Sequence, residues 1–409
     1  MQTNLAPFIR DTAEGKEADA ILRKCVHCGF CTATCPTYQL LGDELDGPRG
    51  RIYLIKEVLE GKRATAKTQL HLDRCLTCRS CETTCPSGVQ YGRLVDIGRA
   101  VVDAQVPRGV GERATRYALS HGLRAKALFG TALLLGRVAR GILPQEVARK
   151  VPAGRAAGSW PAPRHARRVI VPLGCVQPAL APSIDAALAR VLDRIGISAE
   201  GSAGGGCCGA LPYHLNEQAE GLDLVRRNID AWWPAIGRGA EAIITTSSGC
   251  GVMVKDYGHL LANDPAYAQK ALRVAELARD PVEVVSDEWK SIAAKVAMDR
   301  GSERIAFHPP CTLQHGMKLR GRVEEILRAI GHELVPVADA HLCCGSAGTY
   351  SVLQPALADE LKRRKLAALQ AERPALIVSS NIGCQTHLAS GTSRPVRHWI
   401  EVLDDKMMA

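Results

Sequence analysis

Two cysteine runs near the amino end constrain this chain more than any other feature. Residues 25–36 read Cys-Val-His-Cys-Gly-Phe-Cys-Thr-Ala-Thr-Cys-Pro, and residues 75–86 read Cys-Leu-Thr-Cys-Arg-Ser-Cys-Glu-Thr-Thr-Cys-Pro. Both have the spacing C-x2-C-x2-C-x3-C-P. A short loop with three thiolates two residues apart can present all three to one cluster of metal and sulfide, whereas the fourth thiolate points toward a neighbouring cluster. The proline after each fourth cysteine lacks an N–H and ends the loop.

This pattern predicts two [4Fe–4S] clusters whose ligands cross over between the runs. Two zinc sites are one alternative, but zinc sites use C-x2-C pairs separated by a longer gap. A disulfide framework is the other, and it is typical of small secreted chains. Neither alternative explains why both runs have a third cysteine three residues after the second. The predicted ligands are Cys25, Cys28, Cys31 and Cys85 for one cluster, and Cys75, Cys78, Cys81 and Cys35 for the other.

Length and composition favour a multidomain cytoplasmic protein. The 409 residues are enough for two or three domains. The first twenty residues mix charges and contain no apolar segment, so we expect no signal peptide. Sixteen cysteines without a signal favour a reducing compartment and metal ligation. The longest apolar stretch, residues 127–136, is too short to cross a bilayer.

The net charge of +10 is concentrated in one segment. Residues 104–168 contain thirteen Lys or Arg and two acidic residues, a net +11. We expect no nucleic-acid partner, because aromatic residues are scarce here and no nucleic-acid fold motif is present. The functional interpretation is contact with an anionic membrane surface or an acidic protein. The alternative is a solvated basic linker.

The amino-terminal half should contain two parts. Residues 1–103 are predicted to form a small all-α dicluster domain, similar to ferredoxins, and residues 104–167 a basic helical connector. Pro48 suits the first turn of a helix that extends to residue 59. In that helix, Arg49 and Arg51 face either the clusters or solvent.

From residue 168 the chain repeats itself. Apolar strands at 168–172 and 304–308 each lead through a proline-bearing loop to a cysteine and then to a helix, and further apolar strands follow at 242–246 and 375–379. Strands that alternate with helices indicate a parallel sheet in each copy. The predicted fold class is therefore α + α/β, in which the all-α domain precedes two pseudo-symmetric α/β lobes, at 168–300 and 301–409.

Each lobe carries four cysteines in matched positions. A lone cysteine is followed 32 residues later by a Cys-Cys-Gly motif in both copies, and a last cysteine follows the next strand. One buried cysteine is unremarkable, but parallel strands end at a common edge, so these thiols should converge there. We expect a further metal cluster in at least one lobe. The candidate ligands are Cys175, Cys207, Cys208 and Cys250 in the first lobe, and Cys311, Cys343, Cys344, Cys384 and His387 in the second.

Two details qualify this hypothesis. The last cysteine of each lobe resembles the start of a C-x2-C pair whose second member is replaced, by Met253 in one lobe and by His387 in the other. Histidine can ligate iron, and methionine is a poor ligand for it. Residues 204–209 also fit the G-x-G-x-x-G pattern of dinucleotide sites. We expect no nucleotide there, because residues 197–200 read as a poor strand and the second lobe lacks the glycines.

These motifs together resemble the iron–sulfur subunits of glycolate oxidase (glycolate dehydrogenase). The likeness covers essentially the whole chain, and it includes residues 43–53 (Asp-Glu-Leu-Asp-Gly-Pro-Arg-Gly-Arg-Ile-Tyr) and 381–388 (Asn-Ile-Gly-Cys-Gln-Thr-His-Leu). It extends to the D-type subunits of heterodisulfide reductases and the C-type subunits of anaerobic glycerol-3-phosphate dehydrogenases. In heterodisulfide reductases, a Cys-Cys-Gly lobe with five cysteines holds a non-cubane cluster, whereas each lobe here has four.

The resemblance implies an electron-transfer role without catalytic residues on this chain. Two flavin-domain subunits, with FAD on them and not on this chain, would oxidise glycolate to glyoxylate, and also D-lactate. Electrons would pass one at a time through this chain toward a membrane quinone-type acceptor, with the complex peripheral on the inner face of the cell membrane. One alternative is a heterodisulfide or quinone reductase with its own cluster in the lobes. Others are an electron-transfer subunit for a glycerol-3-phosphate or lactate dehydrogenase, and a docking platform.

Overall fold

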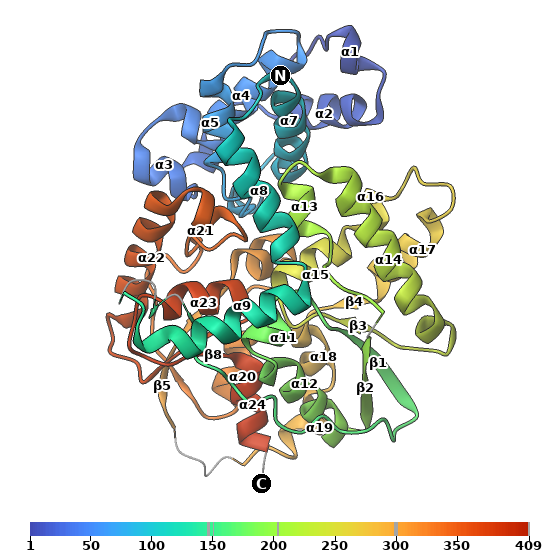
Figure 1. The fold of residues 1–409 in the computed structure, drawn as a ribbon, viewed down its shortest axis with the longest axis vertical. Coiled ribbons are helices and arrows are strands. Elements are labelled where there is room, and N and C mark those ends of the chain that lie inside the picture. The colour runs from blue at the N-terminus through green and yellow to red at the C-terminus, as the bar shows by residue number, and fades with distance from the viewer. Residues whose placement is uncertain (145–147, 150, 203, 298–301, 408–409) are drawn as a thin grey trace.

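A computed structural model describes residues 1–409 except 145–147, 150, 203, 298–301 and 408–409. In Figure 1 a helical domain lies above two α/β lobes that stand side by side. Helices α8 (Val110–Gly122) and α9 (Lys126–Val138) run from the helical domain across the front of the lobes. This arrangement confirms the predicted class, an all-α domain followed by two α/β lobes.

The amino-terminal domain packs helices around its cysteine loops. Helix α4 begins at Pro48, whose fixed φ suits the first helical position, and the chain turns at Gly61 with a φ of 105° that favours glycine. Leu94 and Val95 of α7 are buried in the core that α4 shares. The elements are α1 (Pro7–Arg10), α2 (Ala13–Lys24), η1 (Phe30–Thr32), α3 (Pro36–Leu41), η2 (Glu44–Asp46), α4 (Pro48–Leu59), α5 (Ala66–Asp73), α6 (Ser80–Thr84) and α7 (Tyr91–Gln105).

Each lobe contains a four-stranded parallel sheet. The strand order is β2-β1-β3-β4 in the first lobe and β6-β5-β7-β8 in the second, so the two sheets have the same topology. In both, the two central strands end at the loops that carry the lone cysteine and the last cysteine. The strands are β1 (Arg167–Pro172), β2 (Ile197–Ser202), β3 (Ile243–Ile244), β4 (Ala278–Arg279), β5 (Arg304–His308), β6 (Glu333–Leu334), β7 (Leu376–Ser379) and β8 (Val396–His398).

The expectation that residues 197–200 make a poor strand is wrong. They begin β2, which pairs in parallel with β1 along its whole length. Ile197, Ser198 and Ala199 are buried, because helix α12 (Ser183–Arg194) packs on this strand. The preference of a residue for a strand depends on such neighbours more than on its intrinsic propensity, so small residues are accommodated here.

The glycine-rich stretch after β2 is held by the lobe itself. The Asn228 side chain, on helix α14 (Gln218–Gly237), accepts a hydrogen bond from Gly206 N at 2.9 Å and donates one to the carbonyl of Cys207 at 2.8 Å. The loop is therefore shaped around the cysteine pair.

The two lobes share a hydrophobic core where α12 packs on the last helix, α24 (Trp399–Met407). Arg190 and Arg194 of α12 both form ion pairs with Asp404 of α24 at 2.6 Å. The remaining helices of the first lobe are α11 (Gln177–Leu180), α13 (Ala210–His214), α15 (Ser248–Lys255), α16 (Tyr257–Leu260), α17 (Ala268–Leu277), α18 (Pro281–Asp287) and α19 (Trp289–Ala293). Those of the second lobe are the π-helical turn η4 (Thr312–Gly316), α20 (Arg322–Ala329), α21 (Tyr350–Leu353), α22 (Pro355–Gln370) and α23 (Ile382–Ala389).

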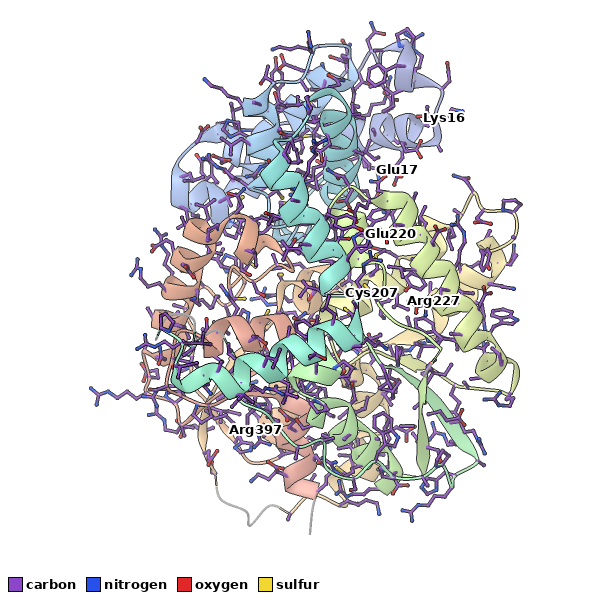
Figure 2. The ribbon with its side chains drawn as sticks, in the orientation of Figure 1. Lys16, Glu17, Cys207, Glu220, Arg227 and Arg397 are labelled. Carbon is purple, nitrogen blue, oxygen red and sulfur yellow. The ribbon has the colours of Figure 1, made fainter. Side chains whose placement is uncertain are left out.

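Polar contacts join the amino-terminal domain to both lobes. In the first lobe, Asp256 accepts from Arg79 at 2.9 Å and His259 contacts Glu17 at 3.2 Å; Figure 2 shows Glu17 at the side of the helical domain that faces this lobe. In the second lobe, the Thr83 hydroxyl lies 2.8 Å from His315 Nδ1, and the Tyr350 hydroxyl donates to the carbonyl of Arg74 at 3.1 Å. The cysteine loops are thus fixed against both lobes.

The connector is not a solvated linker, because many of its arginines pair with carboxylates elsewhere. Arg108 lies 2.6 Å from both Asp73 and Asp103, and Arg124 lies 2.6 Å from Glu220. Much of the positive charge found in the sequence is therefore neutralised within the molecule. The other pairs of connector arginines are Arg116 with Asp73, Arg155 with Glu401, Arg164 with Asp193, and Arg167 with Glu241 and Glu288. Arg168, the first residue of the first lobe, pairs with Glu200.

Candidate metal centres

The four cysteines predicted for the first cluster lie around one small pocket. Cys25, Cys28, Cys31 and Cys85 all line it. Burial raises the pKa of the Cys31 thiol to about 11, and the charges of Cys25, Cys85 and Cys28 add to this rise. Thiolates packed this closely repel one another. A metal cluster would remove that repulsion, because bound metal supplies positive charge and holds the thiols deprotonated.

The four cysteines predicted for the second cluster form another group, further inside the molecule. Burial raises the pKa of Cys81 well above its usual value, and the charges of Cys78, Cys75, Glu82 and Cys35 contribute after burial. Cys35 comes from the first run and the other three cysteines from the second. Cys35 of the first run therefore lies near thiols of the second, and Cys85 of the second run lies near thiols of the first; the assignment of each set of four cysteines to one cluster stays a prediction.

The backbone of both runs is bent to aim these thiols inward. His27 and Gly29 in the first run have φ values of 56° and 85°, and Thr77 and Arg79 occupy the matching positions of the second run at 52° and 59°. Residues other than glycine rarely adopt this region, and each costs about 1–3 kcal/mol. Strain repeated at matched positions, together with the grouping of the thiols, is what loops that wrap around metal clusters require.

A buried guanidinium lies beside the second group. Arg51 is 1% exposed and donates from Nε to the carbonyl of His71 at 2.7 Å, with Asp46 Oδ1 at 3.4 Å from its Nη2. Burial alone would raise the pKa of Cys75, but the charges of Arg51 and Arg99 outweigh it, so the pKa of this thiol is lowered. The protein thus supplies positive charge where anionic ligands are predicted.

The first-lobe cysteines form a connected group. Hydrogen bonding to Cys207 and burial raise the pKa of Cys175, and hydrogen bonds to Cys207 and Cys250 raise that of Cys208. In the view of Figure 2, Cys207 appears beside the lower end of α8. All four predicted thiols of this lobe therefore come together.

The second-lobe cysteines also converge, and they include a neighbour that the sequence analysis missed. Cys311 Sγ lies 3.9 Å from Cys343 Sγ. Cys344 and Cys384 are buried, and their sulfur atoms lie within 4.8 Å of each other and of a ring nitrogen of His308. His308 precedes Cys311 by three residues, and that H-x2-C spacing is the signal that could have identified it.

His387, the histidine that the sequence suggested, lies outside this group of three. Its Nε2 lies 3.3 Å from the carbonyl oxygen of Ala358. Burial, followed by the charge of Lys362, lowers the pKa of its ring to about 4. A neutral imidazole of this kind remains chemically able to ligate a metal.

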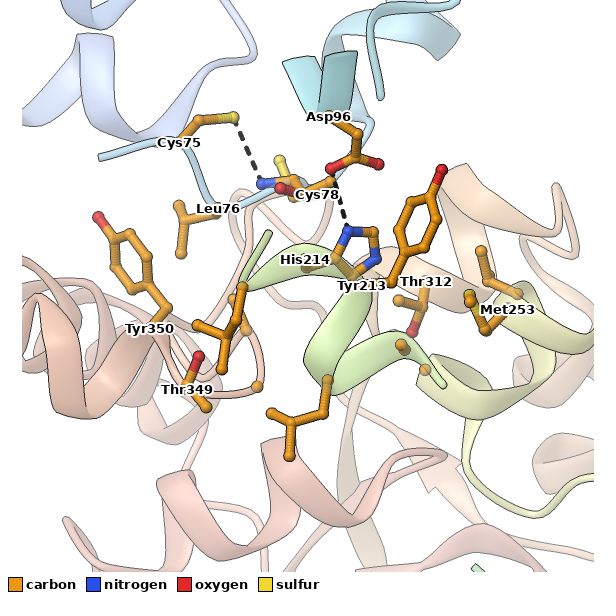
Figure 3. Close-up of a pocket in the computed structure, with 18 of the residues that line it drawn as sticks. Cys75, Leu76, Cys78, Asp96, Tyr213, His214, Met253, Thr312, Thr349 and Tyr350 are labelled. Atoms are coloured by element: carbon orange, nitrogen blue, oxygen red, sulfur yellow. Dashed lines mark hydrogen bonds and ion pairs between the residues drawn. The ribbon is translucent and has the colours of Figure 1, made fainter. Parts of the chain in front are cut away.

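A cavity of about 1450 Å³ lies where the amino-terminal domain meets both lobes. In Figure 3, Cys75 and Cys78 lie along the top of this space, with Tyr350 of the second lobe on one side and Tyr213 of the first on the other. The Asp96 carboxylate contacts His214 Nδ1 at 3.1 Å across the domain boundary. Cysteines of all three parts line the cavity: Cys75 and Cys78; Cys175, Cys207, Cys208 and Cys250; and Cys311, Cys343 and Cys384.

Cys78 lies close to the second lobe. Burial raises the pKa of Cys78 most, and the charge of Cys311 is the next largest cause. The charge of Cys78 in turn contributes to raising the pKa of Cys343. Leu76 and Cys78 also pack in one apolar cluster with Cys311, Cys343 and Tyr350. The second thiol group of the helical domain and the thiols of the second lobe therefore meet directly.

Comparisons with known proteins agree with this arrangement. Residues 21–89 match the 4Fe-4S dicluster domain family, and residues 169–255 and 305–389 each match the Cysteine-rich domain family, CCG. The chain is 56% identical to the glycolate oxidase iron-sulfur subunit of Escherichia coli over 408 residues, covering 100% of this chain and 99% of that protein. It is 29% identical to the probable glycolate oxidase iron-sulfur subunit of Bacillus subtilis, covering 91% and 89% of the two chains. Lactate utilization protein A of Bacillus licheniformis is 23% identical over 57% of this chain and 97% of its own length.

Proposed function

The chain belongs to the family of glycolate oxidase iron–sulfur subunits, and from this premise we propose that it transfers electrons within a complex that oxidises glycolate to glyoxylate, and also D-lactate. The observation that carries this proposal is the crossed grouping of eight thiols: Cys25, Cys28, Cys31 and Cys85 would hold one [4Fe–4S] cluster, and Cys75, Cys78, Cys81 and Cys35 the other. When bound, such clusters supply one-electron redox chemistry. FAD and the oxidation of substrate would reside on two flavin-domain partner subunits.

The first cysteine group is the side at which a flavin subunit would dock. Cys28 is exposed, and the apolar side chains of Val26 and Phe30 beside it are 68% and 62% exposed. Apolar surface left open beside a redox site is typical of a protein interface. The second group lies deeper, so electrons from a docked partner would arrive at the first group.

The exit from the chain lies on the side of the lobes. Cys78 contacts the apolar cluster that includes Cys311 and Cys343, and the cavity extends from there to both lobes. We propose that at least one lobe holds a further metal centre, and that the acceptor is a quinone-type molecule of the membrane.

Helix α9 is the proposed membrane-facing element. No residue of α9 is buried, and Leu128, Leu135 and Val138 recur on it at helical spacing with exposures of 63%, 64% and 79%. Lys126 and Arg137 lie on the same helix. Exposed apolar residues interspersed with basic ones are typical of helices that lie on anionic membranes. Among the described helices, none could span a bilayer. The proposed contact through α9 is peripheral, on the cytoplasmic face.

A second candidate function is reduction of a disulfide or quinone at the lobes themselves. The observation in its favour is the large cavity lined by cysteines of both lobes. This chain alone, supplied with an artificial electron donor, would then turn over such a substrate. The electron-transfer proposal predicts no such turnover.

Glycolate-driven bleaching tests the electron-transfer proposal. The visible iron–sulfur absorption of the anaerobic chain should fall on addition of glycolate only when the flavin subunits are present. Phe30→Asp should slow this bleaching at least tenfold at limiting partner concentration, because it puts a charge into the proposed interface, whereas Leu272→Glu, at another half-exposed apolar side chain, should not. Glycolate oxidation by the isolated chain, or equal rates in both variants, would contradict the proposal.

A further inference from the structure

His308 places an imidazole against two buried thiols in the second lobe. One of its ring nitrogens, Cys344 Sγ and Cys384 Sγ all lie within 4.8 Å of one another. Three separate segments supply them: the end of β5, the Cys-Cys-Gly loop and the first turn of α23. Metal–nitrogen and metal–sulfur bonds of about 2.0–2.3 Å place ligand atoms at such separations around a single ion. Thiolates on different irons of a cubane would lie further apart.

Within the part of the chain that the structure describes, the imidazole of His308 has no hydrogen-bond partner. His308 is 1% exposed, and neither ring nitrogen has a hydrogen-bond partner among the described residues. A buried polar group without a partner costs about 1–3 kcal/mol, so each case requires a physical reason. His332 of the same lobe is also buried without a partner, but no metal-ligating group found among the described residues includes it. The adjacent thiols distinguish His308 from His332.

The surroundings fix these three groups and favour anionic ligands. Asn381 caps α23 by accepting from Gly383 N at 2.8 Å and from Cys384 N at 3.4 Å. Gly345 adopts a φ of 92°, and a Cβ there would lie 2.6 Å from the carbonyl oxygen of Ala358, so the Cys-Cys-Gly loop is packed tightly on α22. Lys365 is 4% exposed, and its ammonium group interacts electrostatically with the thiols of Cys344, Cys343 and Cys384. A buried ammonium group compensates the charge that two thiolates bring into the core.

The first lobe lacks this combination. Pro172 precedes Cys175 by three residues, as His308 precedes Cys311, so the imidazole has no counterpart there. Met253 likewise occupies the position of His387. The two lobes have the same sheet and the same four cysteines but differ in the nitrogen ligands that they can offer.

We propose that His308, Cys344 and Cys384 bind one metal ion in the second lobe, and that the first lobe has no such site. The ligand set suits the metals that thiolates and imidazoles share, Zn²⁺ and iron. This inference deepens the proposed function, because it rests on the presence of a further metal centre in the lobes and names its lobe and its nitrogen ligand.

Metal analysis of the full-length chain, purified without oxygen, tests the proposal. The wild-type chain should contain zinc, or iron beyond the eight atoms of two [4Fe–4S] clusters. His308→Phe should lose this extra metal and keep the amino-terminal clusters, as judged by their EPR signals. His308→Cys should retain it. His332→Phe is the matched control, since it removes another buried, unpartnered imidazole from the same lobe, and it should leave the metal content unchanged.

A spectroscopic measurement on the unmutated chain covers the case in which the variants do not fold. X-ray absorption at the zinc edge, or pulsed EPR of an additional iron centre, should show imidazole nitrogen together with sulfur. An all-sulfur environment, or extra metal that persists in His308→Phe, would show that His308 is not a ligand. It would leave open a metal centre held by other residues of the lobe. If the wild-type chain holds no metal beyond the eight irons, the proposed lobe centre itself is absent, and the role of the amino-terminal clusters is tested separately by glycolate-driven bleaching.

Discussion

Replacing Arg51 tests whether its buried guanidinium supports the second cysteine group. The side chain donates to the carbonyl of His71 at 2.7 Å and to Thr37 Oγ1 at 3.1 Å, and it lies 3.4 Å from the fully buried Asp46. Arg51→Met keeps most of the volume but removes all three interactions. Asp46 retains Arg74 at 2.8 Å, but it loses one of its two arginines. Removing one member of a buried ion pair costs about 3–5 kcal/mol.

The assay is anaerobic urea unfolding followed by the loss of iron–sulfur absorption. With a denaturant slope of roughly 1–3 kcal/mol/M, a cost of about 3–5 kcal/mol should lower the midpoint for Arg51→Met by about 1–5 M. Arg49→Met is the matched control: Arg49 lies two residues away, but its ion pair with Glu44 is on the surface, and such pairs contribute about 0–1 kcal/mol. Arg51→Met should also lower the reduction potential of the second cluster, because a positive charge is removed beside Cys35 and Cys75. Equal midpoint shifts in the two variants would refute this reasoning.

Three further predictions follow from the same structure. Cys35→Ser should damage the cluster held by the second cysteine run, and Cys85→Ser the cluster held by the first, as seen in their separate EPR signals. If each substitution instead damaged the cluster of the run in which it lies, the crossed assignment would be contradicted. Leu128→Glu combined with Leu135→Glu should reduce co-flotation with anionic phospholipid vesicles at least tenfold, since burying each leucine stabilises binding by about 1.5–3 kcal/mol; unchanged flotation would exclude α9 as the membrane contact. Burial raises the pKa of Asp280 to about 7, so the protonated form stabilises the fold below about pH 4, and this contribution, roughly 4 kcal/mol, is lost as pH rises through 7. Asp280→Asn keeps the helix-capping acceptor for Val282 N and should flatten the decline of the melting temperature over this range; an identical decline in both proteins would show that Asp280 does not titrate there.

The cysteine groups were predictable because their geometry is set locally. Three thiols separated by two residues must share a short loop, and the crossed assignment follows from the turn before the fourth cysteine. The duplication was predictable for a related reason. The interval of 32 residues between the lone cysteine and the Cys-Cys-Gly motif is the same in both lobes, and two apolar strands alternate with helices at matched positions.

Features that depend on distant partners were not predictable. Arg49 and Arg51 are equivalent in the sequence, but one pairs with Glu44 at the surface while the other is buried beside Asp46. Residues 197–200 form a strand only because β1 and α12 surround them. His308 stands next to Cys344 and Cys384 through the folding of three separate segments.

The charge of the connector shows the same limit. The sequence shows how many basic residues the segment has, but it does not show that Arg108 pairs with Asp73 or that Arg124 pairs with Glu220. Within the connector, the exposed apolar side of α9 remains available to an outside partner, because α9 contributes no buried residue to the fold.

The central claim is that eight crossed thiols of the amino-terminal domain hold two [4Fe–4S] clusters that carry single electrons. EPR of the dithionite-reduced chain, purified without oxygen, with spin integration and sulfide analysis, tests it most directly. The account predicts two magnetically interacting [4Fe–4S]⁺ signals per chain, which both appear when glycolate and the flavin subunits replace dithionite. A colourless chain without acid-labile sulfide, or a complex that oxidises glycolate at full rate while these signals are absent, would contradict it.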